Sequence, residues 1–113
     1  MEIPDPIKED IDNLGGLEGI AGRIPDPSEI ERLSRIYRSL ADPLRLQIAH
    51  ILDVQPLCVC CIKELIQISD SKLSYHLSQL RDAGLIEGRQ EKNWIIYRTT
   101  NEFRRGIMWG AWR

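Results

Sequence analysis

Residues 69–86 read SDSKLSYHLSQLRDAGLI, and this stretch decides the fold. Its leucines recur at the spacing that places side chains on one side of an α-helix, at Leu73, Leu77 and Leu80. Ser69 is a typical N-cap residue, and Gly84 suits the left-handed conformation that often ends a helix. The spacing therefore predicts a helix after Ser69 with one apolar face and one polar face.

Three further helices are predicted on the N-terminal side of this one. Ser28, with Glu31 three residues later, has capping-box spacing and predicts one helix start; Asp42-Pro43 predicts a second. A short third helix is expected over residues 62–68, with Leu65 and Ile66 facing the core. A short helix, a tight turn and a longer helix form a helix-turn-helix, whose second helix enters the major groove of DNA.

A β-hairpin is predicted after Gly84. Residues 85–89 and 94–100 are rich in strand-forming residues, and the charged tip 90–93 joins them. A hairpin at this place is a wing that can touch the DNA backbone. The predicted fold class is mainly α with a small β-hairpin, a dimeric winged helix-turn-helix. The dimer is inferred from residues 101–113, a predicted helix whose Trp109 and Trp112 would leave a monomer with exposed apolar surface.

The charge is unevenly spread along the 113 residues. Residues 1–34 carry nine acids and three bases, whereas the rest carries eight acids and twelve bases. Residues 1–27 hold four prolines and four glycines, so we expect an acidic arm with a short helical turn after Pro6, followed by a DNA-binding domain over 28–113. No run is long and apolar enough for a membrane helix or a signal peptide, so a cytoplasmic protein with reduced thiols is expected.

The outward face of the helix after Ser69 carries short polar side chains that can bind phosphates or base edges. With two basic residues of the hairpin, the candidate contacts to double-stranded DNA are Ser71, Lys72, Ser74, Tyr75, Ser78, Gln79, Arg89 and Lys92. An ordinary solvated helix face is the alternative reading of the same pattern. His76 lies beside the apolar stripe and is expected to be a packed, hydrogen-bonded residue.

Two segments together resemble the ArsR/SmtB family of metal-sensing repressors. These are residues 40–48, LADPLRLQI, and residues 74–86, SYHLSQLRDAGLI. The resemblance covers about residues 30–100. It implies a dimeric winged helix that leaves its operator when an effector binds, with the first and last helices of the domain forming the dimer interface.

The three cysteines lie together, just before the short third helix, as Cys58, Cys60 and Cys61. The resemblance implies a thiolate box here, because the family's metal-binding sequence Leu-Cys-Val-Cys matches residues 57–60. The family's arsenic-sensing branch has its third cysteine where this chain has Lys63, and Cys61 takes the place of the usual acid. Cys58 and Cys61 would share a helical face, whereas Cys60 reaches them only if the first turn is distorted.

Three readings of the cysteines stay open. Three sulfurs suit As(III) or Sb(III) as an effector, and Zn²⁺ or Cd²⁺ would want a fourth ligand. Cys58 and Cys61 also have Cys-x-x-Cys spacing, so thiol oxidation is the rival switch. A structural apolar trio is the third reading. No obligatory cofactor is expected, and the two histidines fall in no catalytic motif, so we predict a non-enzyme. The alternative function is a winged-helix protein-interaction module with structural cysteines and no operator DNA.

Overall fold

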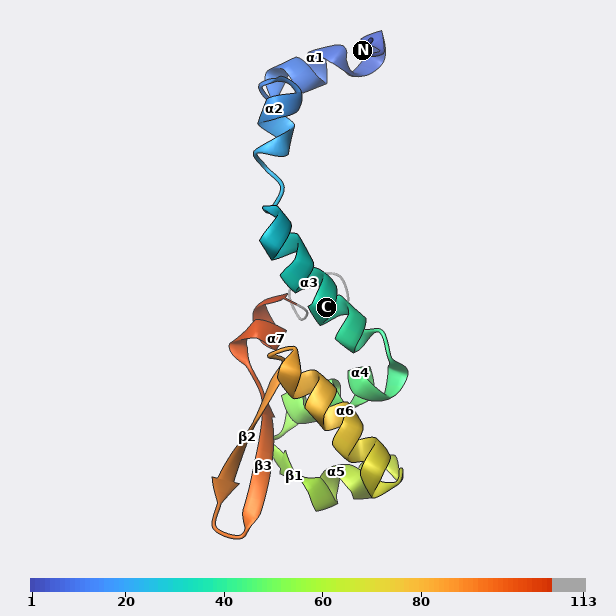
Figure 1. Ribbon diagram of the computed structural model, residues 1–113, viewed down its shortest axis with the longest axis vertical. Helices are drawn as coiled ribbons and strands as arrows, with labels where there is room; N and C mark the ends of the chain where they lie inside the picture. The colour runs from blue at the N-terminus through green and yellow to red at the C-terminus, as the bar shows by residue number, and fades with distance from the viewer. Residues whose placement is uncertain (107–113) are drawn as a thin grey trace. The chain divides into compact units, whose positions relative to one another are not determined.

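The structure, a computed structural model, describes residues 1–106. It consists of two compact units, one formed by Met1–Leu33 and one that begins at Ser34 (Figure 1). None of the helices among the described residues is both long enough and apolar enough to cross a lipid bilayer.

The first unit contains more helix than the sequence predicted. Two helices, α1 (Asp5–Asn13) and α2 (Gly16–Ala21), replace the single turn expected after Pro6. Pro6 lies in the first turn of α1, where its missing N–H group has no helical partner to lose. Gly15 separates the two helices with a φ of 93°, a left-handed conformation that glycine adopts without strain.

Helix α3 (Pro27–Leu40) begins one residue before Ser28, so the predicted cap is wrong. Asp26 takes this role: its Oδ1 accepts hydrogen bonds from the Glu29 backbone N–H at 3.0 Å and from the Ser28 hydroxyl at 2.7 Å. Asp26-Pro27 thus starts α3 as Asp42-Pro43 starts α4 (Pro43–Val54), where Asp42 accepts from two backbone N–H groups as predicted. The dipeptide Asp-Pro occurs three times, at residues 5–6, 26–27 and 42–43, and its last two copies start helices in this way.

The helix-turn-helix consists of α5 (Val59–Ile66) and α6 (Asp70–Asp82). The predicted cap of α6 is confirmed, because Ser69 Oγ accepts from the Lys72 backbone N–H. Gly84 follows the helix with a φ of 76°, also as predicted. Helix α5 begins at Val59 rather than at residue 62, and this shift places Cys60 and Cys61 inside its first turn.

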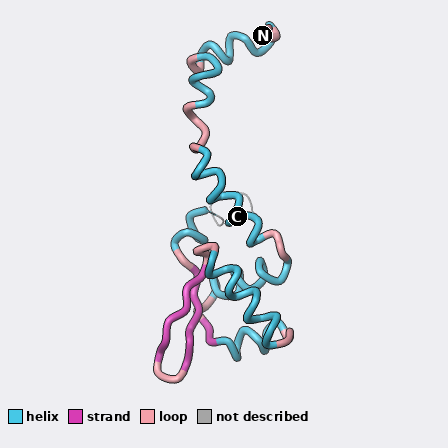
Figure 2. Tube along the Cα trace, in the orientation of Figure 1, coloured by secondary structure: helices cyan, strands magenta, loops and turns pink. Residues whose placement is uncertain are grey.

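The wing is a three-stranded antiparallel sheet with the order β1-β3-β2 (Figure 2). The hairpin β2 (Ile86–Glu91) and β3 (Trp94–Thr99) confirms the prediction, and Lys92 starts its tight turn with a φ of 56°. The sequence did not predict β1 (Leu57–Cys58), which pairs Leu57 with Tyr97 and Cys58 with Ile96. The cysteine segment is therefore part of the wing sheet.

The core of the second unit lies between α4, α5, α6 and the hairpin. The predicted stripe of α6 is buried, as Leu73, Leu77 and Leu80. Ile62 is the buried residue of α5, whereas Leu65, expected to face the core, is 60% exposed. Ile66, the other residue of α5 expected to face the core, does pack against it, because it lies four residues after Ile62 on the same side of the helix.

The segment after β3 starts as the predicted helix, α7 (Asn101–Gly106). Its Phe103 is completely buried and makes an edge contact with the ring of His50 at a centroid distance of 6.0 Å. Phe103 therefore belongs to the core of the unit. The tail on which the predicted dimer rests, Ile107–Trp112, lies outside the described residues.

Candidate nucleic-acid interface and thiol cluster

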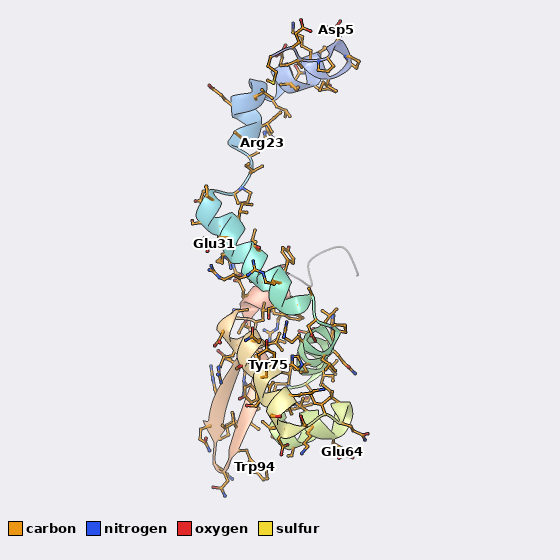
Figure 3. The ribbon with its side chains drawn as sticks, turned by 45° about the vertical axis from the view of Figure 1, so that its right-hand side comes forward. Asp5, Arg23, Glu31, Glu64, Tyr75 and Trp94 are labelled. Atoms are coloured by element: carbon orange, nitrogen blue, oxygen red, sulfur yellow. The ribbon has the colours of Figure 1, made fainter. Side chains whose placement is uncertain are left out.

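The candidate reading residues of α6 lie together on its outward side. Ser71, Lys72, Ser74 and Tyr75 are exposed, and Ser78 and Gln79 are half-buried. Tyr75 is 56% exposed and rests edge-on against the His76 ring, which limits the motion of an otherwise free aromatic side chain. The Ser78 hydroxyl donates to the Tyr75 carbonyl at 2.8 Å, so its oxygen is left to accept from a ligand. Figure 3 shows Tyr75 on this helix.

His76 is buried, as its place beside the apolar stripe predicted. An Arg45 guanidinium nitrogen lies 3.2 Å from its Nδ1, and Arg45 Nε donates to the Ser39 carbonyl at 2.6 Å. Arginine is always a donor, so Nδ1 is the acceptor in this contact. His76 therefore positions α6 against α4 and the end of α3.

A basic pocket borders α6 and was missed by the sequence analysis. Tyr75 and Gln79 line this pocket of about 360 Å³ together with Arg35, Arg38 and Arg45. Asp82 also lines the pocket, so three guanidinium groups accompany one carboxylate, and this excess of positive charge favours a phosphate there. Arg35 and Arg38 are one helical turn apart, and this spacing was the signal that could have indicated the pocket.

The two wing candidates are exposed, and one of them is partly neutralised. Arg89 forms an ion pair of 3.4 Å with Glu87, whereas Lys92 lies in the turn at the tip. Figure 1 shows the tip of the hairpin and the start of α6 at the same end of the unit. The wing and the N-terminal half of α6 can thus face one surface together.

The thiols of the cysteine cluster converge. Cys58 is the N-cap residue of α5 and has an extended backbone, with φ −78° and ψ 164°. Its Sγ lies 2.9 Å from Cys60 Sγ and 3.6 Å from Cys61 Sγ, and all three sulfurs lie within 4.8 Å of one another. The expectation that the Cys60 sulfur reaches the other two only through a distorted helical turn is wrong. Cys58 lies outside the helix, at its N-cap, and its extended backbone places its own sulfur beside the sulfur of Cys60.

The thiols have unequal acidity. Hydrogen bonds from the Cys60 thiol and from the backbone N–H and thiol of Cys61 lower the pKa of Cys58 to about 7. The same thiol contacts raise the pKa of Cys60 and of Cys61, because each thiol donates its proton to Cys58 and losing that proton would break the hydrogen bond. Cys58 is therefore the first thiolate and the first nucleophile of the cluster.

The sulfur spacing suits a soft ion. A tetrahedral Zn²⁺ site with Zn–S distances of about 2.3 Å separates its sulfurs by roughly 3.8 Å. The observed separations of 2.9 and 3.6 Å need only small side-chain rotations to reach that value. Cys60 and Cys61 are exposed and Cys58 is half-buried, so a ligand can enter from solvent. The donor set of three thiols without a histidine or carboxylate favours a thiophilic, three-coordinate centre.

Comparison with known proteins adds family relationships to this geometry. The family described as "Bacterial regulatory protein, arsR family" matches residues 42–87. An arsenical resistance operon repressor of Staphylococcus xylosus is 37% identical over 65% of this chain and 70% of its own length. An arsenical resistance operon repressor of Bacillus subtilis is 34% identical over 70% of this chain and 76% of its own.

Solved structures share the fold. Reduced HlyU from Vibrio cholerae superposes with a TM-score of 0.64 and 28% identity, covering 69% of this chain and 83% of that one. The homodimeric winged helix-turn-helix DNA-binding domain of Mb0332 from Mycobacterium bovis gives a TM-score of 0.65 and 26% identity, covering 69% and 73%. The winged helix-turn-helix predicted from the sequence is confirmed.

Proposed function

This chain belongs to the arsR family of bacterial regulatory proteins, a family of DNA-binding transcriptional regulators rather than enzymes, and we propose that it is a repressor released from its operator through Cys58, Cys60 and Cys61. The observation that carries this proposal is the convergence of three sulfurs at the start of the helix that precedes α6. A cytoplasmic setting, where thiols stay reduced, suits such a sensor.

The proposed DNA surface is the outward side of α6 with the tip of the wing. Lys72 and Lys92 supply charge for phosphates, and Tyr75 reads a base edge. The remaining contacts come from Ser71, Ser74, Ser78, Gln79 and Arg89. All of these side chains except the half-buried Ser78 and Gln79 are exposed, which supports the proposal, as does the basic pocket beside Tyr75.

We propose that the operator is bound by a homodimer. The Mycobacterium bovis domain is a homodimer of the same fold. In this chain, Ile30 and Tyr37 of α3 are about half exposed, which leaves large apolar side chains of this helix open to water. A second copy that covers α3 would bury them, and each copy would then present one α6 to a half-site.

The proposed effector is As(III), with Sb(III), Cd²⁺ and Zn²⁺ as further thiophilic candidates. Cys58 belongs to β1, whereas Cys60 and Cys61 belong to α5, so a centre bound to all three pulls on the wing sheet and the helix-turn-helix together. The ligand must bind the released conformation more tightly, since equal affinity would shift nothing. A coupling of about 1–3 kcal/mol per site is the usual range.

Thiol oxidation is the second candidate mechanism. The low pKa of Cys58 and its distance of 3.6 Å to Cys61 Sγ favour a disulfide, formed when an oxidant such as a peroxide takes two electrons from the pair. One relative in structure is described as the reduced form of HlyU, a statement about that protein. Both mechanisms use the same cysteines, so substitutions alone do not distinguish them. The reagent that releases the DNA, a metalloid or an oxidant, does.

A gel-shift titration on the DNA upstream of the protein's own gene tests the proposal. Under a phosphine reductant, arsenite should release the DNA, and Cys58→Ser or Cys60→Ser should abolish the release without weakening DNA binding; Cys61→Ser should at least weaken it. Release by peroxide alone, reversed by a dithiol, would replace the metalloid mechanism with the redox one. DNA binding with release under neither condition would make the cysteines structural. No binding to DNA at all would favour a protein-interaction module.

A further inference from the structure

An apolar groove opens beside the cysteine cluster and extends to the wing. It has a volume of about 500 Å³, and Cys58, Val59, Cys60, Trp94 and Ile95 lie along it. Trp94 is 55% exposed, Ile95 44% and Val59 38%. Large apolar side chains that gather in an open concavity next to reactive groups indicate a binding site for an apolar ligand group.

The polar rim of the groove is electrically neutral. Lys63 Nζ and an Asp70 carboxylate oxygen form an ion pair, so neither side chain presents a net charge to a ligand. Figure 3 shows Trp94 at the end of the hairpin, where the pairing of β1 with β3 brings the wing to the cysteines. The groove therefore selects for apolar groups rather than for an anion.

Two of the three cysteines line the groove and the third does not. Cys58 and Cys60, the pair 2.9 Å apart, line the groove, whereas Cys61 is not among its lining residues. An arsenic centre bound by this pair directs its third substituent either toward Cys61 or into the groove. On the proposed metalloid response, inorganic arsenite takes the first arrangement and binds all three thiols.

We propose that the groove accepts the organic group of a trivalent arsenical that carries one aryl or alkyl substituent, bound through Cys58 and Cys60. This proposal rests on the proposed metalloid response and names a ligand class for it. Phenylarsonous acid, C6H5As(OH)2, forms two As–S bonds with two thiols while its two As–OH bonds break, each hydroxyl leaving as water with one thiol proton. The As–C bond stays intact, arsenic stays trivalent, and the ring lies against Trp94.

The test compares arsenite with phenylarsonous acid by direct binding to the full chain in a phosphine-reduced buffer, followed by native mass spectrometry and by release of the upstream DNA. In Cys61→Ser, arsenite binding should fall by at least tenfold while phenylarsonous acid still binds and still releases DNA. In Trp94→Ala, the preference for phenylarsonous acid over arsenite should fall on the order of tenfold, because the ring loses its apolar contact.

Two further variants control for folding and for surface character. Trp94→Phe should keep the preference, and Leu65→Ala, an equally exposed apolar residue of α5 outside the groove, should leave it unchanged. An unchanged preference in Trp94→Ala, or loss of both ligands in Cys61→Ser, would overturn the groove proposal alone, since arsenite release by the wild type would stand. Failure of the wild type to bind either arsenical would overturn the metalloid response as well.

Discussion

Arg45 and His76 join the two long helices of the DNA-binding unit, with a guanidinium nitrogen of Arg45 3.2 Å from His76 Nδ1. The same guanidinium donates to the Ser39 carbonyl, so one side chain of α4 connects the end of α3 with the middle of α6. Tyr75, the neighbour of His76, rests on its ring. The orientation of the face of α6 that we propose to contact DNA therefore depends on a contact that is not itself proposed to touch DNA.

Arg45→Ala should lower the free energy of unfolding by about 1–3 kcal/mol, because it leaves the Ser39 carbonyl and His76 Nδ1 without their donor. Urea denaturation measures this, and Arg23→Ala, an exposed arginine of the first unit, is the control. Equal stability of Arg45→Ala and the wild type would contradict the connection. The DNA affinity of Arg45→Ala should also be lower than that of the wild type at urea concentrations below the denaturation midpoint, where the variant is still folded.

Lys72→Ala should weaken DNA binding by a similar factor on every sequence, because a phosphate contact carries no base information. The slope of log affinity against log salt should fall by about 1 for each half-site contacted. Lys8→Ala, in α1, is the matched control and should leave the slope unchanged. A Lys72→Ala slope equal to that of the wild type would place this lysine away from the backbone.

Tyr75→Ala should lose discrimination at one position of each half-site, at a cost of about 1–3 kcal/mol if the hydroxyl reads a base. Tyr75→Phe keeps the ring on His76 and removes only the hydroxyl, so it separates reading from packing. Competition gel shifts with single-base operator variants measure both. Equal discrimination in all three proteins would exclude Tyr75 from base reading.

Alkylation of Cys58 by iodoacetamide should have its midpoint at about pH 7, because donors from Cys60 and Cys61 stabilise the thiolate. Cys60→Ala removes the first of these donors and should move the midpoint upward, toward the value of about 8.5 for an ordinary cysteine. Peptide mapping across pH 5–10 follows each thiol separately. A wild-type midpoint above 8.5 would show that the hydrogen bonds do not form in solution.

Deletion of residues 107–113 should convert the proposed dimer into a folded monomer. Deletion from residue 102 is a poorer experiment, because it removes Phe103, which is completely buried. Light scattering gives the mass and circular dichroism the helix content. A folded dimer after the shorter deletion would show that α3 holds the two copies together without residues 107–113, or that the interface lies elsewhere.

The fold was predictable where local signals sufficed. The spacing of Leu73, Leu77 and Leu80 and the caps at Asp42 and Ser69 needed nothing beyond their own helices. The geometry of the thiols was not predictable in this way. Whether Cys58 continues a helix or stays extended depends on its pairing with Ile96, 38 residues later, and only the extended conformation brings its sulfur to Cys60.

The candidate site was partly predictable for the same reason. The polar face of α6 follows from the period of one helix, whereas the basic pocket needs Arg38 of α3 and Arg45 of α4 to meet Gln79 of α6. Likewise, Trp94 is a strand residue in the sequence and a neighbour of the thiols only after the sheet has formed. Both surfaces join elements that are far apart along the chain.

Strand β1 is held to β3 by only two residue pairs, Leu57 with Tyr97 and Cys58 with Ile96. Strands usually have five or six residues, so a pairing of two residues is weakly stabilised. A ligand that moves Cys58 away from β3 therefore has little pairing free energy to overcome. On the proposed mechanism, the effector concentration that gives half-release is set by this resistance, and Leu57 and Tyr97 contribute to it without touching the ligand. Detection threshold and chemical selectivity are then independent traits, and a regulator of this design can be retuned by exchanging apolar residues while its thiols stay as they are.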